Sequence, residues 1–261
     1  MTTPSKRETP ERAQYRKILT GLCCALAGLG LAFAHLPVLG QPPYPISVVR
    51  AYDEAEQRHN FDQLLAAYGR NKELPPGYEL QALLALSHFP ELGDVRIRFI
   101  YDDVDIPLSS RPFWASMLRS AKNRTYLVVI DSHRDSGRQA LLVKNQPFNA
   151  QVGIIGHELA HAVYYLERSF FGIAADALCQ LSNECRIAFE RATDRRLIEY
   201  GLGWQRYDHA LFVRGEFAAN PEIAANSPGG GGAYMSPLEL REIMNSIAAY
   251  GVESGSASQT D

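Results

Sequence analysis

GIIGHELAHAVYY, residues 153–165, is the stretch that decides the fold of this chain. His157 and His161 are four positions apart, so on an α-helix their imidazoles lie one turn apart on the same face. Glu158 is displaced from them around the helix axis. This spacing predicts that both imidazoles bind one metal ion, while the carboxylate contacts a water on that ion.

The positions around this triplet are apolar or small, which predicts that the helix is buried. They are Ile154, Ile155, Leu159, Ala160, Ala162 and Val163. Burying two imidazoles and a carboxylate without partners would cost on the order of several kcal/mol, and a metal ion supplies the missing partner. The alternative is an ordinary helix that carries the three polar residues by chance.

A catalytic zinc site normally has three protein ligands and a water, so a third ligand is expected on another element. The segment AFERATDRR, residues 188–196, offers Glu190 and Asp194, which lie four apart on one helical face. We predict that Glu190 binds the metal and that Asp194 accepts the other ring N–H of His157. The alternative is a solvated charged face, in which the neighbouring arginines pair with both acids.

With HELAH, residues 157–161, and ERATD, residues 190–194, the sequence resembles the gluzincin group of zinc metallopeptidases, which have HExxH and ExxxD motifs. The resemblance implies one Zn²⁺ ion bound by His157, His161 and Glu190. It also implies that Glu158 is the general base and that Asp194 orients His157. The resemblance covers roughly residues 149–203. The metzincin motif does not fit, because the residues after His161 lack its glycine and third histidine.

Gluzincins also place a tyrosine or histidine opposite the zinc, where it stabilises the oxyanion. No short motif identifies that residue here, although a tetrahedral intermediate needs at least one such donor besides the metal. His209, in WQRYDHALFVR, is the first candidate for a catalytic role, and Tyr207 and Tyr165 are the others.

The N-terminal residues 1–34 have the layout of a secretory signal, a polar basic segment followed by the uncharged run ILTGLCCALAGLGLAFA. The alternative is an uncleaved membrane anchor, because the uncharged stretch extends to about residue 40. Residues 35–45 are expected to be a linker and residues 251–261 a disordered tail. Both alternatives predict an extracytoplasmic protein, either periplasmic or secreted, or anchored by a single pass with its domain outside.

The charge and the cysteines narrow the class of protein further. With 26 basic and 29 acidic residues the formal net charge is −3, so nothing in the charge favours nucleic-acid binding. Two cysteines lie in the N-terminal segment. The other two, Cys179 and Cys185, are expected either to form a disulfide in an oxidising compartment or to remain separate buried thiols.

The hydrophobic pattern predicts mostly helices with a small sheet. TYLVVID, residues 125–131, is interpreted either as an edge strand that holds an extended peptide or as a central strand. Asn149 is expected to cap the HELAH helix. The predicted strands are 95–101, 125–131 and, as a possible third, ALLVK at 140–144, and the remainder of the chain after them is expected to be helical. The helices named by their sequence lie within 46–70, 75–90, 184–201 and 236–250 and in the segment that carries HELAH, and 226–233 is a flexible loop.

Together these features predict an α+β, zincin-like fold, predominantly helical, in a single domain at residues 46–250. A small sheet packs against the HELAH helix. The expected function is zinc-dependent hydrolysis of peptide bonds in a peptide or protein substrate. The alternatives are a catalytically idle, zinc-stabilised envelope binding domain and a helical domain without metal.

Overall fold

The computed structural model describes residues 47–104, 106–132, 139–226 and 232–251. All of them belong to one compact unit that spans residues 41–261. The expected signal or anchor, the C-terminal tail and most of the glycine-rich loop lie outside the described residues. In the described part of the chain, no helix combines the length and the apolar character that crossing a membrane requires.

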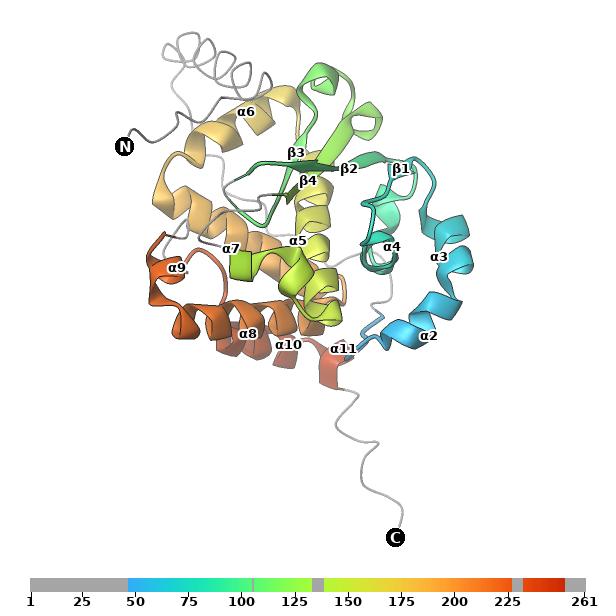
Figure 1. Ribbon diagram of the computed structural model, residues 1–261. Helices are drawn as coiled ribbons and strands as arrows, with labels where there is room; N and C mark the ends of the chain where they lie inside the picture. Colours follow the sequence, from blue (N-terminus) through green and yellow to red (C-terminus); the bar gives the residue numbers. More distant parts are fainter. Residues whose placement is uncertain (1–46, 105, 133–138, 227–231, 252–261) are drawn as a thin grey trace, which may run out of the picture. The chain divides into compact units, whose positions relative to one another are not determined.

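The fold is α+β, with many helices and one small mixed sheet (Figure 1). The strands are β1 (Lys72–Glu73), β2 (Arg96–Asp102), β3 (Leu108–Pro112) and β4 (Thr125–Asp131). The helices are α2 (Glu54–His59), α3 (Phe61–Tyr68), α4 (Glu79–Leu86), α5 (Phe148–Leu166), α6 (Phe170–Cys179), α7 (Asn183–Glu199), α8 (Gly203–Ala219), α9 (Pro221–Asn226), α10 (Pro237–Asn245) and α11 (Ala248–Gly251).

The sheet has the strand order β1-β2-β4-β3. β1, β2 and β4 are parallel, whereas β3 runs antiparallel to β4, with Leu108 opposite Ile130. All seven residues of β4 are buried. TYLVVID is therefore a central strand, and the interpretation of it as an edge strand is wrong. The edge beside it is β3.

The prediction of a third strand in ALLVK is also wrong. These residues lie in two 3₁₀ turns, Gln139–Leu141 and Val143–Asn145, that lead into α5. Sequence reasoning missed two strands, the two-residue β1 and the longer β3, which has the sequence LSSRP and ends in a proline. The serines, the arginine and the proline of β3 give it a low β-propensity, so the sequence does not indicate a strand there. The segment becomes a strand because it pairs with β4.

Helix α5 lies at the centre of the main core, which it shares with the sheet and α4. Fifteen of its nineteen residues are buried, including the whole run from Val152 to Tyr165. A helix buried on all sides cannot be recognised by an amphipathic stripe, and here the apolar flanks of HELAH indicated the burial.

The start of α5 differs from the prediction, because Asn149 is not its N-cap. The helix begins at Phe148 after Pro147, and the Asn149 side chain instead bonds the backbone of Tyr52. Its Oδ1 accepts from Tyr52 N at 2.8 Å and its Nδ2 donates to Tyr52 O at 3.0 Å. This pair of hydrogen bonds attaches the segment before α2 to the start of α5, a tertiary contact that local capping preferences do not reveal.

Glycine lets α5 and α8 approach closely, since a Cβ built on Gly153 would lie 2.2 Å from the carbonyl oxygen of Gln205. Backbone atoms cannot move aside as a flexible side chain can. One turn further on, a Cβ at Gly156 would lie 2.8 Å from the Leu202 side chain. The contact at Gly153 sets the distance at which α8 presents its residues to the HELAH face.

Helix α7 is held at both ends by local features of its sequence. The Ser182 side chain accepts a hydrogen bond from Cys185 N and caps the first turn. A disulfide joins Cys179 to Cys185 across the turn between α6 and α7, with the Cα atoms 5.5 Å apart. Gly201 ends the helix with φ 91°, a conformation that favours glycine.

Helix α10 begins with the predicted capping box. The Ser236 side chain accepts from Glu239 N, and the Glu239 carboxylate accepts from Ser236 N. The predicted helix at 236–250 is interrupted, because α10 ends at Asn245 and α11 starts at Ala248. α10 packs on α7 and α8 around a second, smaller core.

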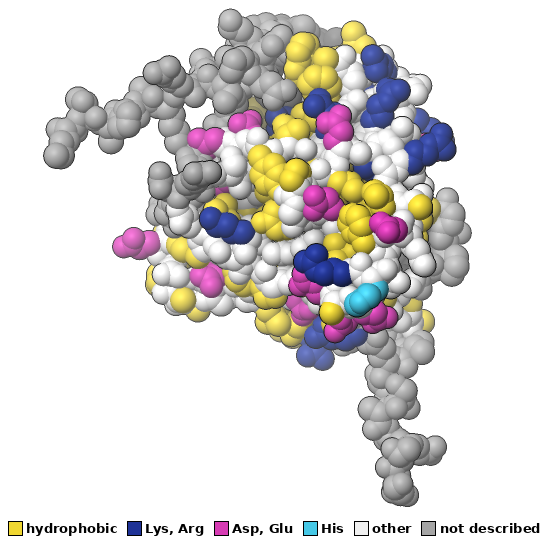
Figure 2. Space-filling model, turned by 45° about the vertical axis from the view of Figure 1, so that its right-hand side comes forward, with side chains coloured by type: hydrophobic (Ala, Val, Ile, Leu, Met, Phe, Trp, Pro, Cys, Tyr) yellow, Lys and Arg dark blue, Asp and Glu magenta, His cyan; other side chains and the backbone are white. Residues whose placement is uncertain are grey.

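Figure 2 shows acidic and basic side chains interspersed with apolar ones on one face of the molecule. Exposed apolar residues such as Leu65 and Tyr101 are scattered among charged ones, which is ordinary for a protein surface.

Replacing Gly153 with alanine should lower the free energy of unfolding by at least about 3 kcal/mol, because the added methyl group overlaps the backbone of α8. Gly215→Ala is the matched control. Gly215 lies in α8 with open space around its Cβ position, so alanine should stabilise the helix by about 1 kcal/mol. Urea denaturation of both variants checks the sign of each change, and equal stabilities would refute the close approach of the two helices.

Candidate metal centre

The candidate site forms where α5 crosses α7. His157, Glu158 and His161 are buried, and each offers one ligand atom within 4.8 Å of the others. This buried group could hold a metal ion. Glu190 faces the group from the middle of α7, five residues after Cys185 of the disulfide.

Three of the ligand atoms form a triangle of the size that a tetrahedral metal site requires. Glu190 Oε2 lies 2.9 Å from His157 Nε2 and 3.3 Å from His161 Nε2, and the two Nε2 atoms are 3.1 Å apart. Ligands bound tetrahedrally at about 2.0–2.1 Å from zinc are separated by about 3.3 Å. The two histidines and Glu190 thus have the spacing of three corners of such a tetrahedron.

The hydrogen bonds on the far side of each ring fix which nitrogen carries the proton. Asp194 Oδ1 lies 2.8 Å from His157 Nδ1 and, as a carboxylate oxygen, accepts its proton. Thr193 Oγ1 donates to Phe189 O at 3.0 Å, so it accepts from His161 Nδ1 at 3.1 Å. In the neutral rings both Nε2 atoms are then lone-pair acceptors.

Three lone pairs consequently point at one another with no donor between them. Two imidazole nitrogens and a carboxylate oxygen in this arrangement repel, and a cation at their centre reverses the sign of the interaction. Burial disfavours a charge on His157, but its contacts with Asp194 and Glu190 outweigh burial and raise its pKa to about 9. Without a metal ion, His157 therefore takes up a second proton, and the positive charge of its ring replaces the charge of the metal ion.

Aromatic and polar neighbours hold the ligands in place. Phe189 stacks on the His161 ring, with 4.8 Å between the ring centroids. Burial opposes the charge on Glu190, while His161 and His157 stabilise it and lower the pKa of this carboxyl below its ordinary value. Glu190 is therefore anionic, as a metal ligand must be.

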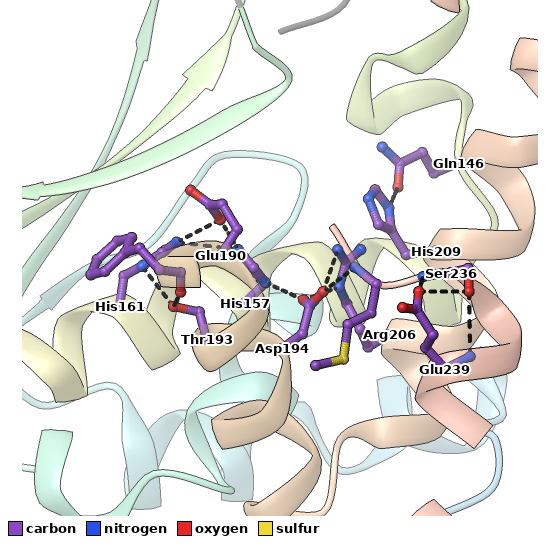
Figure 3. Close-up of polar contacts among 12 residues, drawn as sticks. Gln146, His157, His161, Glu190, Thr193, Asp194, Arg206, His209, Ser236 and Glu239 are labelled. Carbon is purple, nitrogen blue, oxygen red and sulfur yellow. Dashed lines mark hydrogen bonds and ion pairs between the residues drawn. The ribbon is translucent and has the colours of Figure 1, made fainter. Parts of the chain in front are cut away.

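Asp194 is completely buried and connects several parts of the chain (Figure 3). Its Oδ1 accepts from His157 Nδ1 at 2.8 Å and from Arg206 Nε at 2.6 Å. Its Oδ2 accepts from Arg206 Nη2 at 3.3 Å and from Met235 N at 2.9 Å. Burial alone would raise its pKa, but Arg206 and His157 lower it well below the ordinary value. Asp194 therefore stays ionised.

The arginines close to Asp194 in the sequence are not its partners. Arg191 pairs instead with Glu239 of α10, and the Arg206 that pairs with Asp194 comes from α8. The interpretation of Glu190 and Asp194 as a solvated charged face is wrong, because Asp194 is inaccessible to solvent and Glu190 points at the histidines.

Glu158 has the environment of a proton acceptor. Its side chain is buried beside both histidines, and burial raises the pKa of its carboxyl, although His161 and His157 act in the opposite direction. A carboxylate with a raised pKa is a better base than one in water.

Tyr234 is the neighbour of the site that sequence reasoning missed. Its ring centroid lies 5.6 Å from that of His157. Burial raises the pKa of its hydroxyl well above the ordinary value, and the charges of Glu190 and Glu158 raise it further. Tyr234 follows the glycine run and precedes the capping serine of α10, a position with no motif that marks it.

His209 cannot donate a hydrogen bond from its second nitrogen. Gln146 donates from its amide Nε2 to Leu141 O at 2.9 Å, so its Oε1 accepts from His209 Nδ1 at 2.8 Å. The His209 Nε2 is then a bare lone pair. Burial, together with the nearby Arg206 and His157 cations, lowers the pKa of His209 well below its ordinary value, so the ring does not gain a second proton.

The two predicted tyrosines belong to the cores. Tyr165 is buried in the main core, where it packs against Tyr164 and Phe189. Tyr207 packs against Trp204 in the smaller core. The hydrophobic surroundings of these two rings account for their presence without a role at the metal centre.

No protein-family model, curated protein or solved structure matches the chain. The gluzincin resemblance consequently rests on the two motifs alone.

Replacing Glu190 with glutamine should weaken metal binding at least about tenfold, because the only anionic corner of the triangle becomes neutral. Glu184→Gln, at an exposed position in the first turn of the same helix, is the control and should leave binding unchanged. Chelator competition with Zn²⁺ measures both affinities. Equal affinities for the wild type and the Glu190 variant would remove Glu190 from the set of ligands.

Proposed function

We propose that this protein is a zinc-dependent peptidase that hydrolyses peptide bonds of peptide or protein substrates outside the cytoplasm. The observation that carries the proposal is the convergence of His157 Nε2, His161 Nε2 and Glu190 Oε2, which lie 2.9–3.3 Å from one another. Two imidazoles and one carboxylate form a ligand set typical of catalytic zinc, which leaves the fourth position for water.

The residues present fit a resident Zn²⁺ ion. Both histidines offer Nε2 in the tautomer that metal binding needs, and Asp194 fixes that tautomer in His157. A bound Zn²⁺ ion supplies a water of lowered pKa and polarises the carbonyl of the substrate.

Glu158 takes the proton of the attacking water and delivers it to the leaving amine. Its place on α5 next to His157, but around the helix axis, supports this role rather than that of a ligand. The raised pKa of its carboxyl makes it a stronger base, and burial beside the histidines keeps bulk water from competing for the proton.

Tyr234 donates a hydrogen bond to the oxyanion that develops on the carbonyl oxygen. Its ring contact with His157 supports this role. The raised pKa keeps the hydroxyl protonated, so it remains a donor at neutral pH. We prefer Tyr234 to His209, whose available nitrogen is an acceptor.

β3 is suited to hold an extended substrate. It is antiparallel to β4, packs against α5, and within the described residues pairs with β4 alone. An edge strand of this kind binds a peptide by continuing the sheet.

The location outside the cytoplasm has support from two sources. The N-terminal sequence has the layout of a signal or an anchor. The disulfide between Cys179 and Cys185 is typical of an oxidising compartment.

The second candidate is a zinc-stabilised binding domain without catalysis. In that case a fourth protein ligand closes the site, and Glu158 is the residue of the buried group that can provide it. The two functions therefore make opposite predictions for a change at Glu158.

Exchanging Glu158 for glutamine should leave zinc content unchanged and lower kcat by about 10²–10⁴-fold, because the amide cannot accept the proton of the water. Glu167→Gln, at the exposed residue directly after α5, should change neither. Zinc analysis and a peptide-library assay give the two measurements. A variant that loses zinc would favour the closed site, and a wild type that cleaves no peptide would refute the peptidase.

Tyr234→Phe removes only the phenolic hydroxyl. We expect kcat to fall about 10²–10³-fold with little change in KM or zinc affinity, because the lost hydrogen bond forms in the transition state. Tyr207→Phe is the control, since that ring packs in the smaller core. Steady-state kinetics of both variants decide between the two tyrosines, and full activity of Tyr234→Phe would exclude it as the donor.

A further inference from the structure

Arg206 of α8 is a buried cation that no step of the proposed reaction uses. Its side chain is almost inaccessible to solvent, and it forms two hydrogen bonds with the Asp194 carboxylate. The centre of its guanidinium lies over the Tyr234 ring, 5.3 Å from the centroid. Arg206 thus contacts both the residue that orients a metal ligand and the candidate oxyanion donor.

A buried guanidinium is costly unless it is paired and hydrogen-bonded. Asp194 meets this need with both of its oxygens, a pairing that suits the planar fork of arginine. The remaining hydrogen bonds of the carboxylate go to His157 and to Met235 N. Asp194 and Arg206 therefore form one hydrogen-bonded unit, which lies between His157 and the segment of Tyr234 and Met235.

This unit holds Tyr234 at two points. The N–H of Met235 belongs to the peptide bond that follows Tyr234, and it donates to Asp194 Oδ2. The aromatic ring lies against the Arg206 guanidinium, a cation–π contact. These two contacts, together with the ring contact between Tyr234 and His157, orient the phenol.

We propose that Arg206 is a positioning residue, which holds the Tyr234 phenol toward the metal ligands while it holds Asp194 against His157. The activity readout of this proposal rests on the proposed function, whereas its metal-binding and probe-binding readouts do not. Lysine cannot replace arginine in this position, because it lacks the second donor in a fixed plane and the flat surface for the ring.

The test compares Arg206→Lys, Tyr234→Phe and the double variant. Arg214→Lys, elsewhere on α8, is the control. The first readout is Zn²⁺ affinity by chelator competition. Arg206→Lys should weaken it about tenfold in both the wild-type and the Tyr234→Phe background, because this effect passes through Asp194 and His157.

The second readout is the affinity of the Co²⁺-substituted protein for acetohydroxamate, a small probe that binds the metal through oxygen. Changes in the visible Co²⁺ spectrum measure this affinity. Tyr234→Phe and Arg206→Lys should each weaken the probe about tenfold. The double variant should be no weaker than Tyr234→Phe alone, because Arg206 acts on the probe through the tyrosine hydroxyl. Where peptides are cleaved, kcat should show the same pattern with KM unchanged.

Additive losses of probe affinity in the double variant would overturn the proposal, as would unchanged zinc affinity in Arg206→Lys. Arg206→Gln, which removes the buried charge but keeps one donor, is the second variant if lysine prevents folding. Loss of the fold in both variants would make Arg206 a structural residue and would also overturn the proposal. Cleavage of no peptide by the wild type refutes the peptidase but leaves the probe measurements valid.

Discussion

The carboxylate of Asp194 is the interaction on which the rest of the metal centre depends. It has no exposed surface, and its two oxygens accept hydrogen bonds from α5, α8 and the segment before α10. An ionised carboxylate in such a place is stable only while every one of these donors is present. Because one of the donors is His157, the packing of three helices also fixes the tautomer and direction of a candidate metal ligand.

The scaffold explains how these donors come together. Gly153 lets α8 approach α5 to backbone contact, and this approach brings Arg206 beside Asp194. The disulfide and Ser182 fix the start of α7. Glu190 and Thr193 lie further along this helix. On the other side of α5, the sheet provides a buried central strand and the antiparallel edge β3. The histidines therefore lie between the sheet and a helical layer.

Much of this arrangement could be predicted because it is recorded in local spacing. Four features depend on residues that are close together in the sequence. They are the HELAH helix, strand β4, the capping box at Ser236 and the end of α7 at Gly201. Strand β3 and the role of Asn149 could not be predicted, because each depends on a partner far along the chain. The place of Tyr234 beside the site could not be predicted for the same reason, because its neighbour His157 is remote in sequence and no motif surrounds the tyrosine.

The sequence by itself determined which chemical groups share a helical face: His157 with His161 on α5, and Glu190 with Asp194 on α7. The fixed rise and turn of the α-helix make that face a function of spacing alone. Only the tertiary structure decided that these two faces meet, that the arginine beside Asp194 comes from α8, and that a tyrosine lies against the metal ligands. These are contacts between helices, and they follow from packing distances and buried hydrogen bonds that no short stretch of sequence contains.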